Sequence, residues 1–129
     1  PLAPDSLYYL TNDAIENCTV YDFQNNRAGQ VYDFGRAMGK DPYELFLSGP
    51  LSLLTMENPQ AQAGRELILF RDSFGSSIAP LLISGYSKIT LVDIRYIHPD
   101  YLARFIDFEG CDVLFLYSTL VLNNSETLK

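Results

Sequence analysis

The stretch Arg71-Asp-Ser-Phe-Gly-Ser-Ser77 carries the residue types best suited to chemistry in this chain. It follows a short apolar run and precedes a segment that ends at Gly85. A serine between a buried strand and a helix lies where open α/β sheets bind ligands, beside amide N–H groups that have no partner within the helix. That position suits a nucleophile whose oxyanion the amides stabilise. It suits an anion site or a simple helix cap equally well.

His98 is the only histidine in the chain, and there is no tryptophan. A single histidine excludes multi-histidine metal sites and leaves one candidate for a general base of the usual kind. His98 follows Asp93, at the end of another apolar run, and both are candidates for the same sheet edge as Ser73. A solvent-facing residue just before Pro99, at a helix start, is the plainer interpretation.

Arg95 and Tyr96 are expected to line the same edge and, together with Ser76 near the candidate nucleophile, to bind the substrate or an anion. Arg95 either binds an anionic substrate group or pairs with Asp72; a structural ion pair is the plainer interpretation. Five tyrosines of the first half form either a sugar-stacking surface or ordinary packing: Tyr8, Tyr9, Tyr21, Tyr32 and Tyr43.

Composition limits the classes of function. The chain has 129 residues, 47% of them hydrophobic, which fits a single domain with a sizeable core. Nine basic and sixteen acidic residues give a net charge of −7, which argues against nucleic acid or an anionic membrane as the partner. No apolar run approaches the roughly 18 residues of a membrane span. The acidic residues lack metal-site spacing, so we expect no metal and no cofactor.

Cys18 and Cys111 lie far apart in the sequence and form no CxxC motif. Buried free thiols are the favoured interpretation, and a single disulfide stays open. The chain begins with proline rather than methionine, which is typical of a trimmed piece of a longer protein.

Three apolar runs in the second half predict parallel strands that are buried on both faces. They are Glu66–Arg71, Lys88–Asp93 and Asp112–Tyr117. A helix is expected over Ser76–Tyr86, capped by Ser76 or Ser77, with Pro80 near its first turn. A second helix is expected over His98–Glu109, with Tyr101, Leu102, Phe105 and Ile106 on its apolar face. This β-α-β-α-β order predicts right-handed crossovers.

The first half is less regular. We expect strands over Leu7–Leu10, Cys18–Phe23 and Leu51–Met56. Helices are expected over Gly29–Met38 and Pro42–Leu47, the second with Asp41 as its N-terminal cap.

Residues 41–117 resemble the DHHW family, a bacterial branch of the SGNH-hydrolase-like superfamily that is related to the alginate O-acetylation proteins. The resemblance depends on the order and spacing of five elements. These are Tyr43-Glu-Leu-Phe-Leu-Ser-Gly-Pro-Leu51, Leu67-Ile-Leu-Phe-Arg-Asp-Ser-Phe-Gly75, Pro80-Leu-Leu82, Ile89-Thr-Leu-Val-Asp-Ile-Arg-Tyr96 and Asp112-Val-Leu-Phe-Leu-Tyr117.

The resemblance implies a flavodoxin-like, three-layer α/β sandwich with a mainly parallel sheet. It places Ser73 on the family's nucleophile position and Asp72 on the acidic residue before it. Gly49 falls where the superfamily often has an oxyanion-hole glycine. The backbone N–H groups of Phe74 and Gly75 are the other expected donors to the oxyanion. It also implies an extracellular or cell-envelope location.

The Asp-x-His-Trp motif that names the family is absent from this chain. We therefore expect the chain to be the nucleophile-bearing, C-terminal part of an acyl-ester hydrolase or O-acetyltransferase of envelope polysaccharides. Its base would come from elsewhere, so the isolated chain would be inactive. The alternatives are a non-catalytic envelope domain that binds glycan or protein, and a binder of a phosphorylated ligand at Ser73–Ser77.

Overall fold

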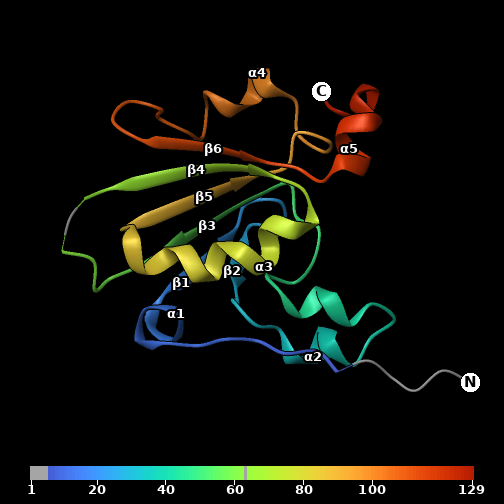
Figure 1. Cartoon of the computed structure of the whole chain (residues 1–129). Helices are drawn as coiled ribbons and strands as arrows, with labels where there is room; N and C mark the ends of the chain where they lie inside the picture. The colour runs from blue at the N-terminus through green and yellow to red at the C-terminus, as the bar shows by residue number, and fades with distance from the viewer. Residues whose placement is uncertain (1–5, 63) are drawn as a thin grey trace, which may run out of the picture.

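The computed structural model describes residues 6–62 and 64–129, and a six-stranded sheet forms their centre (Figure 1). The strand order is β2-β1-β3-β5-β4-β6. The strands are β1 (Thr19–Asp22), β2 (Arg27–Gly29), β3 (Leu53–Glu57), β4 (Glu66–Arg71), β5 (Lys88–Val92) and β6 (Asp112–Leu116).

The sheet is mixed. β4 pairs in parallel with β5 and β6, as the second half of the sequence predicts, so the carboxyl ends of these three strands meet at one edge. The pairs β1–β2, β1–β3 and β3–β5 are antiparallel. The α/β class and the layered sandwich are thus confirmed; the sheet is parallel among β4, β5 and β6 and antiparallel in every pair that involves β1 or β3.

Helices lie on both faces of the sheet (Figure 1). The helix α3 (Ser73–Leu82) crosses one face, on the same side as α1 (Asp13–Asn17), and α4 (Pro99–Leu102) lies over the other. The remaining α-helices of the described residues are α2 (Phe34–Ala37) and α5 (Thr119–Asn123). Short 3₁₀ turns are η1 (Pro42–Leu45), η2 (Ile83–Gly85) and η3 (Ser125–Thr127).

The start of α3 differs from the prediction. The helix begins at Ser73, and its cap is Asp72, whose carboxylate accepts a hydrogen bond from the Phe74 N–H. Neither Ser76 nor Ser77 caps it, because the helix already begins directly after Asp72, which fills that role. Pro80 consequently lies inside the helix rather than in its first turn.

The helix predicted over His98–Glu109 is also shorter. Only Pro99–Leu102 is α-helical, and turns follow. Leu102 and Ile106 pack into the core, whereas Tyr101 and Phe105 are about half exposed, so only part of the predicted apolar face has a partner.

Two segments of the first half are not what periodicity predicts. Leu7–Leu10 forms no strand and is exposed. The helix predicted over Gly29–Met38 is reduced to Phe34–Ala37, because Asp33 caps a helix there and Tyr32 is engaged in a β-bridge with Phe46. The cap predicted at Asp41 is confirmed, although the turn that it starts is 3₁₀.

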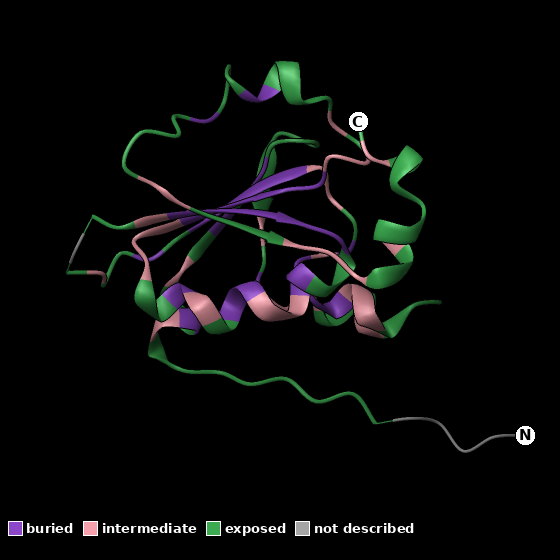
Figure 2. Cartoon of the chain, turned by 45° about the horizontal axis from the view of Figure 1, so that its top comes forward, coloured by how far each residue is buried: buried purple, intermediate pink, exposed green. Residues whose placement is uncertain are grey.

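The core has one hydrophobic cluster on each face of the sheet, and the central strands are buried between them (Figure 2). Leu69 and Leu91 belong to the cluster under α3, and Phe70 and Val92 to the cluster under α4. β6 is the exception to the prediction of burial on both faces. It lies at the sheet edge, and its central apolar residues are exposed: Val113, Leu114 and Phe115.

Candidate functional site

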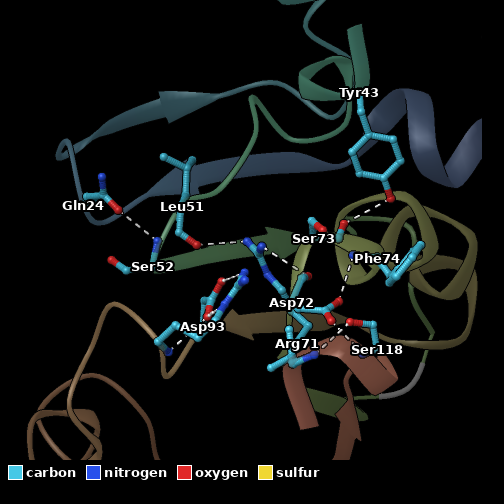
Figure 3. A network of polar contacts seen from close by, with 12 residues as sticks. Gln24, Tyr43, Leu51, Ser52, Arg71, Asp72, Ser73, Phe74, Asp93 and Ser118 are labelled. Carbon is cyan, nitrogen blue, oxygen red and sulfur yellow. Dashed lines mark hydrogen bonds and ion pairs between the residues drawn. The ribbon is translucent and has the colours of Figure 1, made fainter. Parts of the chain in front are cut away.

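Ser73 is the first residue of α3 (Figure 3). Only Asp72 separates it from Arg71, the last residue of β4. It is exposed. Within residues 6–62 and 64–129, neither its hydroxyl nor its amide N–H forms a hydrogen bond, while its carbonyl oxygen accepts one from the Tyr43 hydroxyl. The strand-turn-helix geometry expected from the sequence is therefore present, with a free hydroxyl at its apex.

Asp72 is a buried residue that organises the turn. Its Oδ1 accepts a hydrogen bond from the Phe74 N–H at 3.0 Å, and its Oδ2 accepts one from the Ser118 N–H at 2.6 Å. Its own N–H donates to the Leu116 carbonyl at 3.3 Å. Asp72 thus links the start of α3 to the end of β6. Its carboxylate is hydrogen-bonded to backbone amides and not to Ser73.

The three predicted oxyanion donors already have partners. The Phe74 N–H donates to the Asp72 carboxylate, and the Gly75 N–H donates to the Asp72 carbonyl at 3.1 Å. The Gly49 N–H donates to the Phe46 carbonyl at 3.1 Å. The assignment of Phe74, Gly75 and Gly49 as oxyanion donors does not fit this geometry, because their N–H groups are already hydrogen-bonded within turns and are not free to bind an oxyanion.

Arg95 forms a structural ion pair, as the plainer interpretation predicts, but its partner is Asp93 and not the predicted Asp72. Asp93 is fully buried, and its two oxygens accept hydrogen bonds from Nε and Nη2 of Arg95 at 3.0 and 2.7 Å. These bonds raise the pKa of Arg95. Arg95 therefore pairs with Asp93 rather than with Asp72, and the guanidinium also lies 5.3 Å from the centre of the Tyr96 ring.

His98 is not joined to the serine. Its Nδ1 accepts a hydrogen bond from the Asp100 N–H at 3.2 Å and lies 3.4 Å from the Asp100 carboxylate. The side chain is half exposed, and among the described residues it forms no hydrogen bond with Ser73. It caps α4, so the solvent-facing interpretation describes its position.

Ser76 is buried, and its hydroxyl oxygen has no hydrogen-bond partner among the described residues, so it does not line an open anion site. Ser77, one helical turn from Ser73, lies on the more accessible side. The Tyr43 hydroxyl lies 3.1 Å from the Ser73 carbonyl oxygen (Figure 3). It also lies 2.7 Å from the Ser77 hydroxyl. Tyr43, which belongs to η1, thus fixes the first turn of α3 through hydrogen bonds.

Sequence reasoning assigned no role to Arg71 or Ser118, and it placed Tyr43 only among the tyrosines of a sugar-stacking or packing surface. Arg71 is fully buried, and burial lowers its pKa. An arginine as the last residue of a continuous apolar run is a signal that was available in the sequence. The Ser118 contact carried no such signal, because it joins positions 46 residues apart.

The tyrosines divide into separate groups. Tyr8, Tyr9 and Tyr32 line a groove of about 240 Å³ that also contains Ser77. Tyr21 packs instead against Phe23, with ring centres 4.8 Å apart. The groove begins one helical turn from the candidate nucleophile, whereas Tyr21 belongs to a different surface.

Both cysteines are free thiols. In the part of the chain that the structure describes, no cluster of three or more histidine, cysteine or acidic side chains is arranged to hold a metal ion. No described helix is long and apolar enough to cross a membrane.

No family model and no curated protein matches the chain. Solved structures do. A DHHW family protein from Eubacterium siraeum DSM 15702 has a TM-score of 0.55 and 28% identity, over 85% of this chain and 38% of its own. Bacillus cereus PatB1 has a TM-score of 0.59 and 23% identity, over 87% and 36%. The structure of PatB1 with a sulfonyl adduct has a TM-score of 0.58 and 22% identity, over 87% and 38%.

This chain therefore spans between 36% and 38% of the length of the structures that it resembles. The likeness supports a DHHW-like, SGNH-type fold for the chain.

Proposed function

We propose that this chain is the nucleophile-bearing part of an SGNH-like acyl-ester hydrolase or O-acetyltransferase that acts on a cell-envelope glycan. One observation carries the proposal. Ser73 is exposed at the carboxyl end of β4, at the first position of α3, with its hydroxyl and its amide N–H both unengaged in the described structure. A nucleophile needs the first group, and a developing oxyanion uses the second.

The reaction follows from this arrangement. The Ser73 Oγ forms a bond to the acyl carbon, the ester C–O bond breaks, and the serine proton passes through a base to the departing alcohol. Water or an acceptor hydroxyl then attacks the acyl-serine. Its proton returns through the base to Ser73, and a carboxylic acid or a new ester leaves.

The base belongs outside these 129 residues. His98 is turned to Asp100, and the carboxylates of Asp72 and Asp93 are bonded to backbone amides and to Arg95. The similar solved structures are more than twice as long as this chain, which leaves room in such proteins for a base on another segment.

Two further observations support the proposal. Bacillus cereus PatB1, which shares the fold, has been obtained with a sulfonyl adduct, and a sulfonyl group attaches to a nucleophilic atom. The groove beside Ser77 presents tyrosine rings on which a sugar face can stack, as a glycan substrate requires. An envelope glycan as substrate implies an extracellular or cell-envelope location.

The test is acetyl-ester cleavage by the 129-residue chain and by the protein encoded by the full reading frame. We expect the longer protein to be active and the isolated chain to be inactive. Ser73→Ala is expected to abolish the activity, whereas Ser84→Ala, at an exposed serine of η2, leaves it unchanged. An inactive longer protein, or one indifferent to Ser73→Ala, defeats the proposal.

A non-catalytic envelope domain is the second candidate. The N–H groups of Phe74, Gly75 and Gly49 are already hydrogen-bonded, so the only oxyanion donor left near the serine is the N–H of Ser73 itself. This shortage of donors favours the non-catalytic candidate. It predicts binding that survives Ser73→Ala and is lost when bulky side chains are placed at this edge.

A further inference from the structure

Arg71 is a buried cation with unusual partners. Its side chain is fully buried, yet it forms no ion pair with a carboxylate among residues 6–62 and 64–129. Its Nη2 donates to the Leu51 carbonyl at 3.0 Å, its Nη1 lies 3.5 Å from the Asp72 carbonyl, and its Nε has no partner. Burying a guanidinium in this way is costly, and an apolar side chain of similar volume would fill the space more cheaply.

The Leu51 carbonyl belongs to a strained segment that leads into β3. Leu47, Ser48 and Gly49 have φ angles of 53°, 58° and 88°, and two of these residues carry side chains that disfavour the left-handed region. Such conformations persist only where neighbouring contacts enforce them. The Ser48 hydroxyl donates to Asp33 at 2.8 Å at one end of the segment, and Arg71 holds the other end.

The stem of Arg71 also supports the first turn of α3. A Cβ added to Gly75 would lie 2.4 Å from the Arg71 Cβ and 2.7 Å from its Cγ. The helix backbone therefore rests directly on this side chain. Arg71 thus contacts the strained segment with its head and the helix that begins at Ser73 with its stem (Figure 3).

We propose that Arg71 is a positioning residue for Ser73: its guanidinium holds segment 47–52 against the first turn of α3 and so fixes the serine and the wall beside it. The proposal rests on the proposed role of Ser73 as nucleophile. It accounts for a charge at a position where packing alone favours an apolar residue. A lysine reaches one carbonyl but lacks the planar fork that reaches two, so it replaces Arg71 only in part.

The first test needs no activity. Amide hydrogen exchange is followed in the wild type, Arg71→Met, Arg71→Lys and the exposed control Arg104→Met. We expect exchange in segment 47–52 to rise about 10- to 100-fold in Arg71→Met and less in Arg71→Lys, relative to the amides of β3 and β5. Unchanged protection of segment 47–52 overturns the proposal.

Two further measurements cover the remaining outcomes. Should Arg71→Met fail to fold, side-chain N–H exchange in the wild type decides: Arg71 protons must exchange at least about 10-fold more slowly than those of Arg104. In the protein encoded by the full reading frame, Ser73 is labelled with phenylmethylsulfonyl fluoride. The covalent rate constant is expected to fall about 10-fold or more in Arg71→Met, with partial rescue by Arg71→Lys and an unchanged half-saturating concentration.

An unchanged labelling rate in a folded Arg71→Met variant overturns the positioning role. Absence of labelling in the wild type counts instead against the proposed function, and the exchange measurement still decides what Arg71 does.

Discussion

At the scale of single residues, the candidate site is defined by which polar groups are already engaged. The Asp72 carboxylate accepts hydrogen bonds from two backbone amides, and the Asp93 carboxylate is paired with Arg95. Ser73, by contrast, has an exposed hydroxyl without a hydrogen-bond partner among the described residues. The location of Ser73 is predictable from sequence, because a serine and a glycine that directly follow an apolar strand indicate a turn at the carboxyl end of that strand. The engagement of its neighbours is not, because it depends on contacts between distant segments such as Asp72 with Ser118.

Gly75 gives a prediction at this scale. Gly75→Ala is expected to lower the free energy of unfolding by about 2–3 kcal/mol, because the new Cβ meets the Arg71 Cβ and the helix must shift. Urea unfolding measures the change.

Gly85→Ala is the matched control, since no atom lies within 4 Å of a Cβ at that position. We expect its effect to stay within about 1 kcal/mol, in the stabilising direction. Equal effects at the two glycines would show that the close approach at Gly75 does not exist.

At the scale of elements, strand prediction succeeded where burial is continuous. β4 has the bounds that its apolar run indicates, because a central strand with both faces covered must be apolar throughout. The same pattern misjudged the burial of β6, since nothing in periodicity distinguishes an edge strand from a central one. The start of α3 was misplaced because its N-terminal cap is Asp72. The family resemblance had marked Asp72 as a catalytic-site residue, and it was also a candidate partner of Arg95, but it was not expected to be a cap.

The contact between η1 and α3 gives the second prediction. Tyr43→Phe removes the hydroxyl that bonds the Ser73 carbonyl and the Ser77 hydroxyl, so stability should fall by about 1 kcal/mol. Thermal unfolding measures it. Tyr101→Phe, at an exposed tyrosine of α4, is the control and is expected to change nothing. A Tyr43→Phe variant as stable as this control would disprove the tie.

At the scale of the whole molecule, one core cluster lies on each face of the sheet, and the polar network runs along the edge where β4, β5 and β6 end. This layered plan was predictable, because alternating apolar runs and helical segments in the second half admit few other arrangements. The antiparallel pairing of β3 with β5 was not, because the sequence carries no signal for the direction in which β3 joins the sheet.

Alkaline pH gives the third prediction. Burial raises the pKa of the Cys18 thiol from 9.0 to about 11. The folded chain keeps this proton longer than the unfolded chain, so the associated stability is complete below pH 9 and is lost as the pH rises toward 11. Urea unfolding between pH 8 and 11 should show this decline, and Cys18→Ala should make it shallower.

Tyr117→Phe serves as the comparison, because burial raises the pKa of Tyr117 from 10.0 to about 12. Its effect is expected only above pH 10. A Cys18→Ala variant with the wild-type slope between pH 9 and 10 would contradict the assignment to Cys18.

The central claim is that Ser73 is a nucleophile, and covalent labelling tests it most directly. The protein encoded by the full reading frame is treated with phenylmethylsulfonyl fluoride and examined by intact-mass and peptide mass spectrometry. The Ser73 Oγ should bond to sulfur as fluoride leaves and the serine proton passes to the base, giving one adduct per chain on Ser73. Ser73→Ala should give none, and Ser84→Ala should label as the wild type does. An unlabelled wild type, or an adduct on any other residue, would contradict the account.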